Sequence, residues 1–172
     1  MTGSTDDRMT KGKPVDKKQS ESPDWLPHVT VATVIEKQGR FLMVEESIHG
    51  RLILNQPAGH LNQGETLVDA AVRETLEETG WHVRVDHLIE IAQWTSPNSG
   101  THFVRACFAG SALDQEPGAS LDDGIVRALW MRRDEVEQNA QRLRSPLVLQ
   151  HIDHYISGKR FSLEAFGYYD DH

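Results

Sequence analysis

The chain has 172 residues and a formal net charge of −8 at pH 7. This length suffices to bury the core of one domain, and the negative charge argues against a large surface for duplex nucleic acid. No run approaches the ~18 consecutive apolar residues of a membrane span. The single cysteine, Cys107, rules out a disulfide framework, so we expect a cytoplasmic protein. We expect a monomer or a homodimer.

The N-terminal residues differ in composition from the rest of the chain. Residues 1–24 are mostly Ser, Thr, Asp, Lys and Gly, with almost nothing apolar. Such a segment cannot offset the entropy of ordering by burial, so we predict a disordered tail before a domain that spans 25–172. The domain should begin with three strands, which alternating and β-branched residues place at 28–36, 41–46 and 52–56.

A helix is predicted over 67–79. Thr66 is suited to cap its first turn, and Gly80 is suited to end it in the left-handed conformation. Helical periodicity gives the segment one side that should pack inward. The residues expected on that side are Val68, Val72, Thr75, Leu76 and Thr79.

Three carboxylates lie on this predicted helix, at Glu74, Glu77 and Glu78. At about 100° per residue, their spacing of three and four places them within a stripe roughly 100° wide. Like charges at this spacing repel each other, unless a hard divalent cation binds their oxygens. A solvated acidic face and a metal site are the two interpretations of this pattern.

The order of the later elements indicates the fold class. Strands come first, then one helix, then more strands and closing helices, which argues for an α+β fold. Asp134 is expected to cap the first closing helix. The later elements are predicted as strands at 82–95, 101–110 and 125–131, a loop at 111–124, and helices at 135–140 and 146–156.

The segment 59–81 resembles the signature of the Nudix hydrolases, G-x5-E-x7-R-E-U-x-E-E-x-G-U, where U is a bulky aliphatic residue. Both U positions depart from the pattern, because Thr75 and Trp81 stand there, and both should face the core. The resemblance implies an α/β/α sandwich with a mixed sheet and a loop–helix–loop catalytic motif. The seven fixed positions are all matched, by Gly59, Glu65, Arg73, Glu74, Glu77, Glu78 and Gly80.

The resemblance also implies phosphoanhydride hydrolysis with Mg²⁺, for which Mn²⁺ can substitute. Bound cations neutralise phosphate charge and activate water for in-line attack. The implied ligands are Glu74, Glu77 and Glu78, together with the backbone carbonyl near Gly59. Arg73 would orient a ligand carboxylate, and the catalytic set would include Arg73, Glu77 and Glu78. Glu65 would support this set.

The general base has two candidate sources in the family, a signature glutamate or an acid from a later loop. Asp122 and Asp123 precede Trp130 at the place where many relatives carry such an acid. We take Asp123 as the catalytic candidate and Asp122 as its support. A simple Asp-Asp-Gly turn is the alternative interpretation.

A closer resemblance covers residues 27–165. The runs PHVTVA, NQPAGHL, QW and LRSPLV are similar to the NudJ-type phosphatases. This implies release of orthophosphate from nucleoside tri- and diphosphates and from thiamine-precursor pyrophosphates. One alternative is cleavage of ADP-ribose or another nucleoside diphosphate derivative, because Pro97 stands where such relatives tend to have proline. A nucleotide-binding regulator without turnover is a third interpretation.

The substrate itself is expected to be a small phosphorylated molecule. His60 and Arg144 are candidates for phosphate contact, and Trp94 and Arg105 are candidates for lining a base pocket. Each of the four also has an ordinary explanation as a loop, surface or packing residue. Their contact with substrate is predicted from the resemblance and from their place beside turns.

Overall fold

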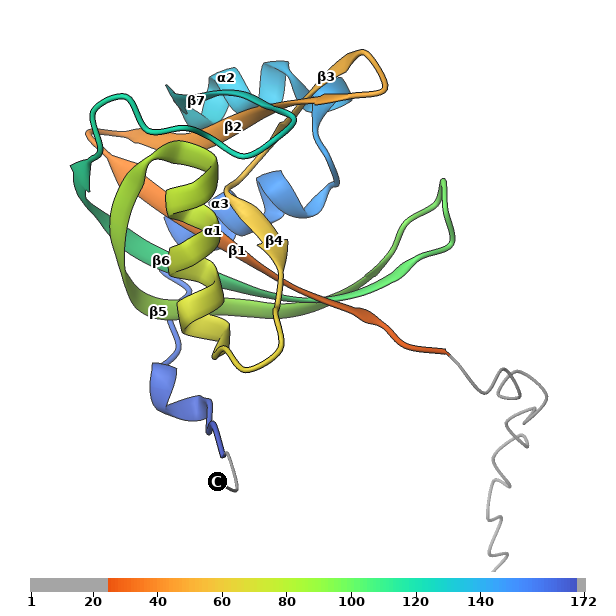
Figure 1. The fold of residues 1–172 in the computed structure, drawn as a ribbon, viewed down its shortest axis with the longest axis vertical. Coiled ribbons are helices and arrows are strands. Elements are labelled where there is room, and N and C mark those ends of the chain that lie inside the picture. Colours follow the sequence, from red (N-terminus) through yellow and green to blue (C-terminus); the bar gives the residue numbers. More distant parts are fainter. Residues whose placement is uncertain (1–24, 170–172) are drawn as a thin grey trace, which may run out of the picture.

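The computed structural model describes residues 25–169, so the predicted tail at 1–24 lies outside the described residues (Figure 1). Within that range, no helix is long and apolar enough to cross a membrane. The strands are β1 His28–Lys37, β2 Arg40–Ile48, β3 Arg51–Asn55, β4 Ala58–His60, β5 Trp81–Thr95, β6 His102–Gln115 and β7 Ile125–Met131. The helices are α1 Leu67–Thr79, α2 Arg133–Gln138 and α3 Leu147–Ile156, with single 3₁₀ turns η1 Ala140–Arg142 and η2 Leu163–Ala165.

The strands form one mixed sheet in the order β3-β2-β1-β6-β5, and β4 pairs with β1 while β7 pairs with β2. The central pair β1 and β6 is parallel, whereas the other pairs are antiparallel. A parallel centre requires helices on both faces, because neither face of such a sheet can be left in water. The arrangement therefore predicts two helical layers.

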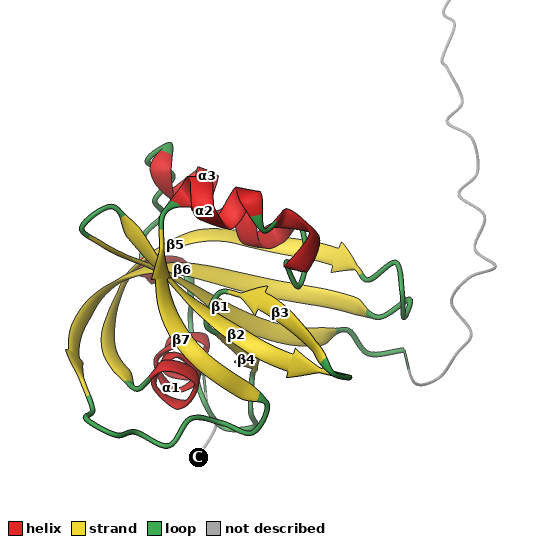
Figure 2. Ribbon diagram, turned by 90° about the horizontal axis from the view of Figure 1, so that it is seen from above, coloured by secondary structure: helices red, strands yellow, loops and turns green. Residues whose placement is uncertain are grey.

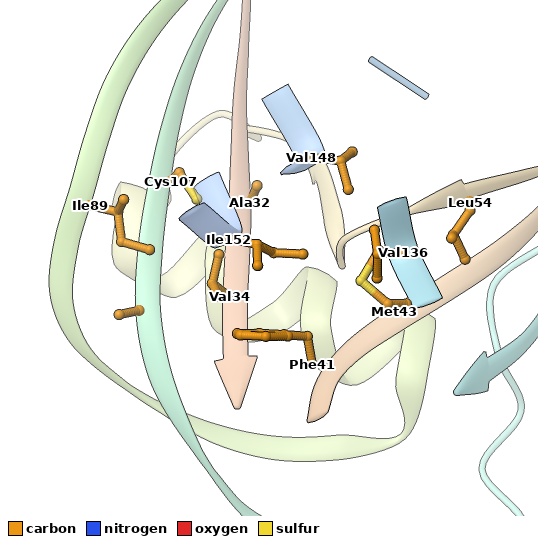
Figure 3. Close-up of a cluster of buried hydrophobic side chains, with 11 residues drawn as sticks. Ala32, Val34, Phe41, Met43, Leu54, Ile89, Cys107, Val136, Val148 and Ile152 are labelled. Atoms are coloured by element: carbon orange, nitrogen blue, oxygen red, sulfur yellow. The ribbon is translucent and has the colours of Figure 1, made fainter. Parts of the chain in front are cut away.

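Those layers are visible in Figure 2, where α1 lies on one side of the sheet and α2 and α3 lie on the other. One core cluster, which includes Val31 and Phe108, packs under α1. The second joins the sheet to α2 and α3 through Met43, Val136 and Ile152 (Figure 3). The predicted α+β sandwich is confirmed.

Strand β1 shows why the sequence folds this way. Val31 belongs to the cluster under α1, while Ala32 and Val34 belong to the cluster under α3. All three are at most 2% exposed. Because successive strand residues point to opposite faces, a strand buried on both sides needs a nearly continuous apolar and β-branched run.

Helix α1 begins and ends as predicted. The Thr66 hydroxyl accepts a hydrogen bond of 3.1 Å from the backbone N–H of Asp69. Gly80 has φ of 69°, and its N–H donates to the Leu76 carbonyl at 2.7 Å. Both helix ends therefore satisfy backbone groups that would otherwise have no partner.

The buried side of α1 differs from the prediction. Thr75 and Thr79 are buried as expected, but Val68, Val72 and Leu76 are only half-buried. The most enclosed positions also include Ala70, Ala71 and Glu78. Glu78 therefore lies on the buried side of the helix and not opposite it, because β4 covers that side. The carboxylate stripe runs from the core edge toward solvent.

Three other expectations need correction. Strand β4 has no counterpart among the predicted strands, because three residues are too few to show periodicity. Strand β6 continues to Gln115, so the expected loop at 111–124 is shorter, since pairing with β5 extends the strand. Helix α2 has Arg132 as its N-cap, and Asp134 lies inside its first turn. The Glu135 carboxylate accepts from the Arg132 N–H at 2.7 Å and fixes that start.

Thr75, which departs from the signature, has hydrogen-bond partners in the core. Its hydroxyl donates to the Ala71 carbonyl at 2.7 Å and lies 2.9 Å from the hydroxyl of Thr33 on β1, with both residues buried. A paired hydroxyl can replace an aliphatic side chain at low cost, whereas an unpaired one cannot.

Thr75→Val should therefore destabilise the fold by about 1–3 kcal/mol, because it leaves the buried Thr33 hydroxyl without a partner. Adding Thr33→Val should recover most of that loss. Urea denaturation of the two single variants and the double variant measures the coupling. Additive losses in the double variant would show that the two hydroxyls do not depend on each other.

Candidate active site

Arg73 of α1 is the centre of a charged network. Its guanidinium donates to Glu65 at 2.6 and 2.9 Å, to Glu74 and Glu77 at 2.8 Å each, and to the His60 carbonyl at 3.0 Å. Hydrogen bonds from Arg73 hold the pKa of Glu65 below its usual range, and the hydrogen bond to Glu65 is the largest influence that raises the pKa of Arg73. Arg73 thus fixes three signature carboxylates and, through Glu65 and His60, ties the helix to the preceding segment.

The Glu74 carboxylate rests directly on the backbone of Gly59 in β4. A Cβ atom on Gly59 would lie 2.0 Å from Cδ and Oε2 of Glu74 and 2.2 Å from its Oε1. Glycine is required here for this close approach of a carboxylate to the strand. The spacing of Gly59 and Glu74 in the signature therefore has a steric reason.

Glu78 is the most deeply buried carboxylate of the stripe. Its Oε2 accepts a hydrogen bond of 2.9 Å from the backbone N–H of Ala58. Burial raises the pKa of Glu78 to about 8, and the nearby charges of Glu46, Glu74 and Asp122 act in the same direction. Burial also raises the pKa of Glu74. Burial therefore favours the protonated form of both carboxyls, although the hydrogen bond and the charge of Arg73 oppose the shift at Glu74.

The donor set fits a hard divalent cation, which prefers carboxylate oxygens. One oxygen each of Glu74 and Glu77 is bonded to Arg73, and one oxygen of Glu78 is bonded to Ala58. The second oxygen of each carboxylate is left for a cation. No cluster of three or more His, Cys, Asp or Glu side chains within residues 25–169 is already converged for metal binding, and Arg73 binds two of the three carboxylates.

A cavity of about 320 Å³ opens beside Glu74 and Glu78. Carboxylates form one part of its wall, and two arginines, Arg105 and Arg144, form another. Its remaining wall is polar and aromatic. The lining residues are Thr30, Glu46, Asn55, Ala58, Gly59, His60, Glu74, Glu78, Trp94, Phe103, Arg105, Arg144, Ser145 and Leu147.

The four residues predicted to contact substrate all line this cavity, although they come from β4, β5, β6 and the loop before α3. The Trp94 ring stacks on Phe103 with centroids 5.6 Å apart. Nδ1 of His28 lies 3.1 Å from Nε2 of His60, and burial, followed by the charge of His28, lowers the pKa of His60. The cavity thus combines an aromatic wall with charged ones.

Asp122 and Asp123 have different surroundings. The Asp122 N–H donates to the carbonyl of Glu77 at 3.0 Å, and its carbonyl accepts from Ile125 at 3.0 Å. This closes the turn that the Asp-Asp-Gly pattern predicts, and it places the Asp122 charge where it raises the pKa of Glu74 and Glu78. Asp122 and Asp123 are both exposed in this turn, but only the charge of Asp122 acts on these two carboxyls. The structure therefore brings Asp122 closer to the signature carboxylates.

Sequence reasoning missed Glu46, which lines the cavity and accepts from the Asn55 amide at 3.1 Å. Its neighbour Glu45 points to the other side and is buried against Arg127, at 2.9 Å, and Arg142. Adjacent residues of a strand ordinarily face opposite sides, and here the pairing of β2 with β7 also shifts register between Glu45 and Glu46. That rule was the available signal, because a strand between two layers cannot place both acids in water.

A family model described as a NUDIX domain matches residues 25–151. The chain belongs to the Nudix family. The protein named Phosphatase NudJ from Escherichia coli (strain K12) is 46% identical over 141 residues, which is 82% of this chain and 91% of that protein. The Phosphatase NudJ of Shigella flexneri matches with the same identity and coverage. As a Nudix hydrolase, the chain acts on acid anhydrides of phosphorus-containing compounds.

Solved structures show the same Nudix fold. A NUDIX hydrolase from Nitrosomonas europaea superposes with a TM-score of 0.83 at 44% identity, over 86% of this chain and all of the other. A MutT NUDIX hydrolase from Burkholderia pseudomallei superposes with a TM-score of 0.64 at 21% identity, over 76% of this chain and 98% of the other. The second likeness concerns the fold alone.

Proposed function

We propose that this Nudix hydrolase is a Mg²⁺-dependent phosphatase that releases orthophosphate from nucleoside tri- and diphosphates and from thiamine-precursor pyrophosphates. The observation that carries the proposal is the cavity, which has carboxylates on one part of its wall and arginines on another. A phosphorylated substrate needs both kinds of group, because a carboxylate-bound cation and guanidinium groups each neutralise phosphate charge. The similarity to Phosphatase NudJ supports the phosphatase class.

Glu74, Glu77 and Glu78 are the residues that would hold Mg²⁺, with the backbone near Gly59, and Mn²⁺ suits the same oxygen donors. When bound, the cation supplies neutralisation of phosphate charge and a lowered pKa of bound water. Arg73 positions Glu74 and Glu77 and does not line the cavity. Glu65 supports Arg73 through two hydrogen bonds.

For the general base, the placement of the two loop acids favours Asp122 over Asp123. Asp122 is anchored through its N–H to the backbone of Glu77, and its charge reaches Glu74 and Glu78. A base must lie within hydrogen-bond reach of the water it deprotonates, directly or through one water. In this proposal Asp123 shapes the turn, and Asp122 or a signature glutamate takes the proton.

The remaining lining residues contact two different parts of the substrate. The expected roles of His60 and Arg105 are exchanged in this proposal. The phosphates face Arg105 and Arg144, and the organic group contacts Trp94 and His60, whose rings belong to an aromatic cluster with Phe103. A π-face accepts any base or thiamine-type ring without selecting one by hydrogen bonds. This supports a substrate class that is broad in its organic part.

The lone buried cysteine supports a reducing, cytoplasmic setting.

A panel of phosphoanhydrides in Mg²⁺ tests the proposal, with orthophosphate and pyrophosphate measured separately. Free orthophosphate from nucleoside di- and triphosphates, without an added phosphatase, is the expected result. The aromatic wall also suits an ADP-ribose-type substrate. Release of AMP and a sugar phosphate from ADP-ribose would favour that alternative. Nucleotide binding without Mg²⁺-dependent turnover across the panel would instead favour a regulator.

A further inference from the structure

Arg105 on β6 carries a buried hydrogen-bond donor without a partner. Its Nη1 is inaccessible to solvent and makes no hydrogen bond within residues 25–169. The Nε atom donates to the Thr30 hydroxyl at 3.3 Å, which holds the guanidinium in the cavity wall. Arg105 is half-buried as a residue, and burial of its guanidinium lowers its pKa. It is therefore a fixed cationic donor with unused hydrogen-bonding capacity.

A second unpaired polar atom lies in the same wall. Ser145 is 6% exposed, and its Oγ has no hydrogen-bond partner among the described residues. Ser145 precedes α3 beside Arg144, and both residues line the cavity with Arg105. The positive charge of Arg144 reaches Arg105 and lowers its pKa further. Two arginines and a hydroxyl therefore share one part of the wall.

This arrangement is unfavourable for folding alone. An unpaired buried donor costs about 1–3 kcal/mol, and more when it is charged. Glu46 and Glu78 are close enough for their charges to favour ionised Arg105, but neither forms an ion pair with it within the described part of the chain. A buried polar group left unpaired in the wall of a cavity marks a place where a ligand can complete its hydrogen bonding.

We propose that Arg105, Arg144 and Ser145 form an anion site that binds orthophosphate even without the metal. Phosphate has enough acceptor oxygens for both guanidinium groups and for the Ser145 hydroxyl, and guanidinium matches its geometry. The donors lie in the same cavity as Glu74 and Glu78. A phosphate held there stays beside the catalytic carboxylates after its bond to the substrate is broken.

This inference rests on the proposed function in one respect. If the enzyme releases orthophosphate, the site retains that product, and orthophosphate inhibits competitively against substrate. Binding of orthophosphate to the metal-free protein does not depend on turnover. A failure of the phosphatase proposal and a failure of the anion site are therefore separate results.

The test is a calorimetric titration of the metal-free full chain with inorganic phosphate, in EDTA and at constant ionic strength. Wild type and Arg51→Met should bind phosphate equally, because Arg51 is an exposed arginine on β3 that does not line the cavity. Arg105→Met should weaken binding by about 10- to 100-fold, the loss expected for charge-assisted hydrogen bonds. Ser145→Ala should weaken it less, because it removes one neutral donor.

Thermal unfolding of the same variants separates a binding role from a structural one. Arg105→Met should leave the Tm of the ligand-free protein unchanged or raised, because it removes an unpaired buried charge. It should abolish the rise in Tm that phosphate gives to wild type. If Arg105→Met does not fold, Arg105→Lys and Ser145→Ala provide the measurement. No phosphate binding by wild type, or unchanged binding in the Arg105 and Ser145 variants, overturns the proposal.

Discussion

Glu78→Gln is expected to lower kcat by about 10²- to 10³-fold or more while the fold is kept. The Gln side-chain oxygen can still accept the hydrogen bond from Ala58 that Glu78 accepts at 2.9 Å. The substitution therefore removes the charge with little change in shape. Steady-state kinetics in Mg²⁺ on a phosphoanhydride that the enzyme turns over, together with a circular dichroism spectrum, check both parts.

The same variant should change how the stability of the metal-free protein depends on pH. Burial raises the pKa of folded Glu78 to about 8, from an ordinary value of 4.5. Between these values the folded state holds a proton that the unfolded state has released. The free energy of unfolding of the wild type therefore falls as pH rises through this range. Glu78→Gln should lack this pH-dependent contribution to the free energy of unfolding. The margin by which the variant is more stable than wild type should therefore be larger at pH 8 than at pH 5.

Glu164→Gln is a suitable control for both measurements. Glu164 is exposed in η2 and does not line the cavity. The Glu164→Gln substitution should leave kcat and the pH dependence of stability unchanged. A Glu78→Gln enzyme with near-wild-type kcat would show that the Glu78 charge is not part of the catalytic centre.

The sequence was sufficient to predict the part of the site that lies on one helix. Fixed rotation per residue brings Glu74, Glu77 and Glu78 together once a helix is assumed, and local capping chemistry locates its ends at Thr66 and Gly80. These features depend on neighbours in the chain. The Nudix resemblance then supplied the sandwich, which the fold and the comparisons confirm.

The rest of the site depends on tertiary packing, which the periodicity of the sequence does not encode. The burial of Glu78 depends on β4, a three-residue strand held by its pairing with β1. The arginine part of the cavity wall depends on β6 lying parallel to β1 and on the loop before α3 returning to Leu54, where the Arg144 N–H donates at 3.0 Å. Strand order sets these contacts, and the sequence pattern gives only the strands.

Gly59→Ala offers a test of the link between β4 and the helix, with an expected fall in kcat of about 100-fold. The backbone of Gly59 does not have positive φ, so alanine is compatible with the strand and should preserve folding. Its Cβ would lie 2.0 Å from the Glu74 carboxylate. The carboxylate, at the end of a flexible side chain, must move away and leave its 2.8 Å contact with Arg73.

A double-mutant cycle with Glu74→Ala shows whether Gly59 acts through this carboxylate. In the Glu74→Ala background the new methyl group meets no carboxylate, so Gly59→Ala should cause almost no further loss of kcat. The two single variants should each be impaired, and the double variant should match Glu74→Ala. Additive losses would mean that the methyl group disturbs something other than Glu74. Equal rates for Gly59→Ala and wild type would mean that the position of this carboxylate does not limit the reaction.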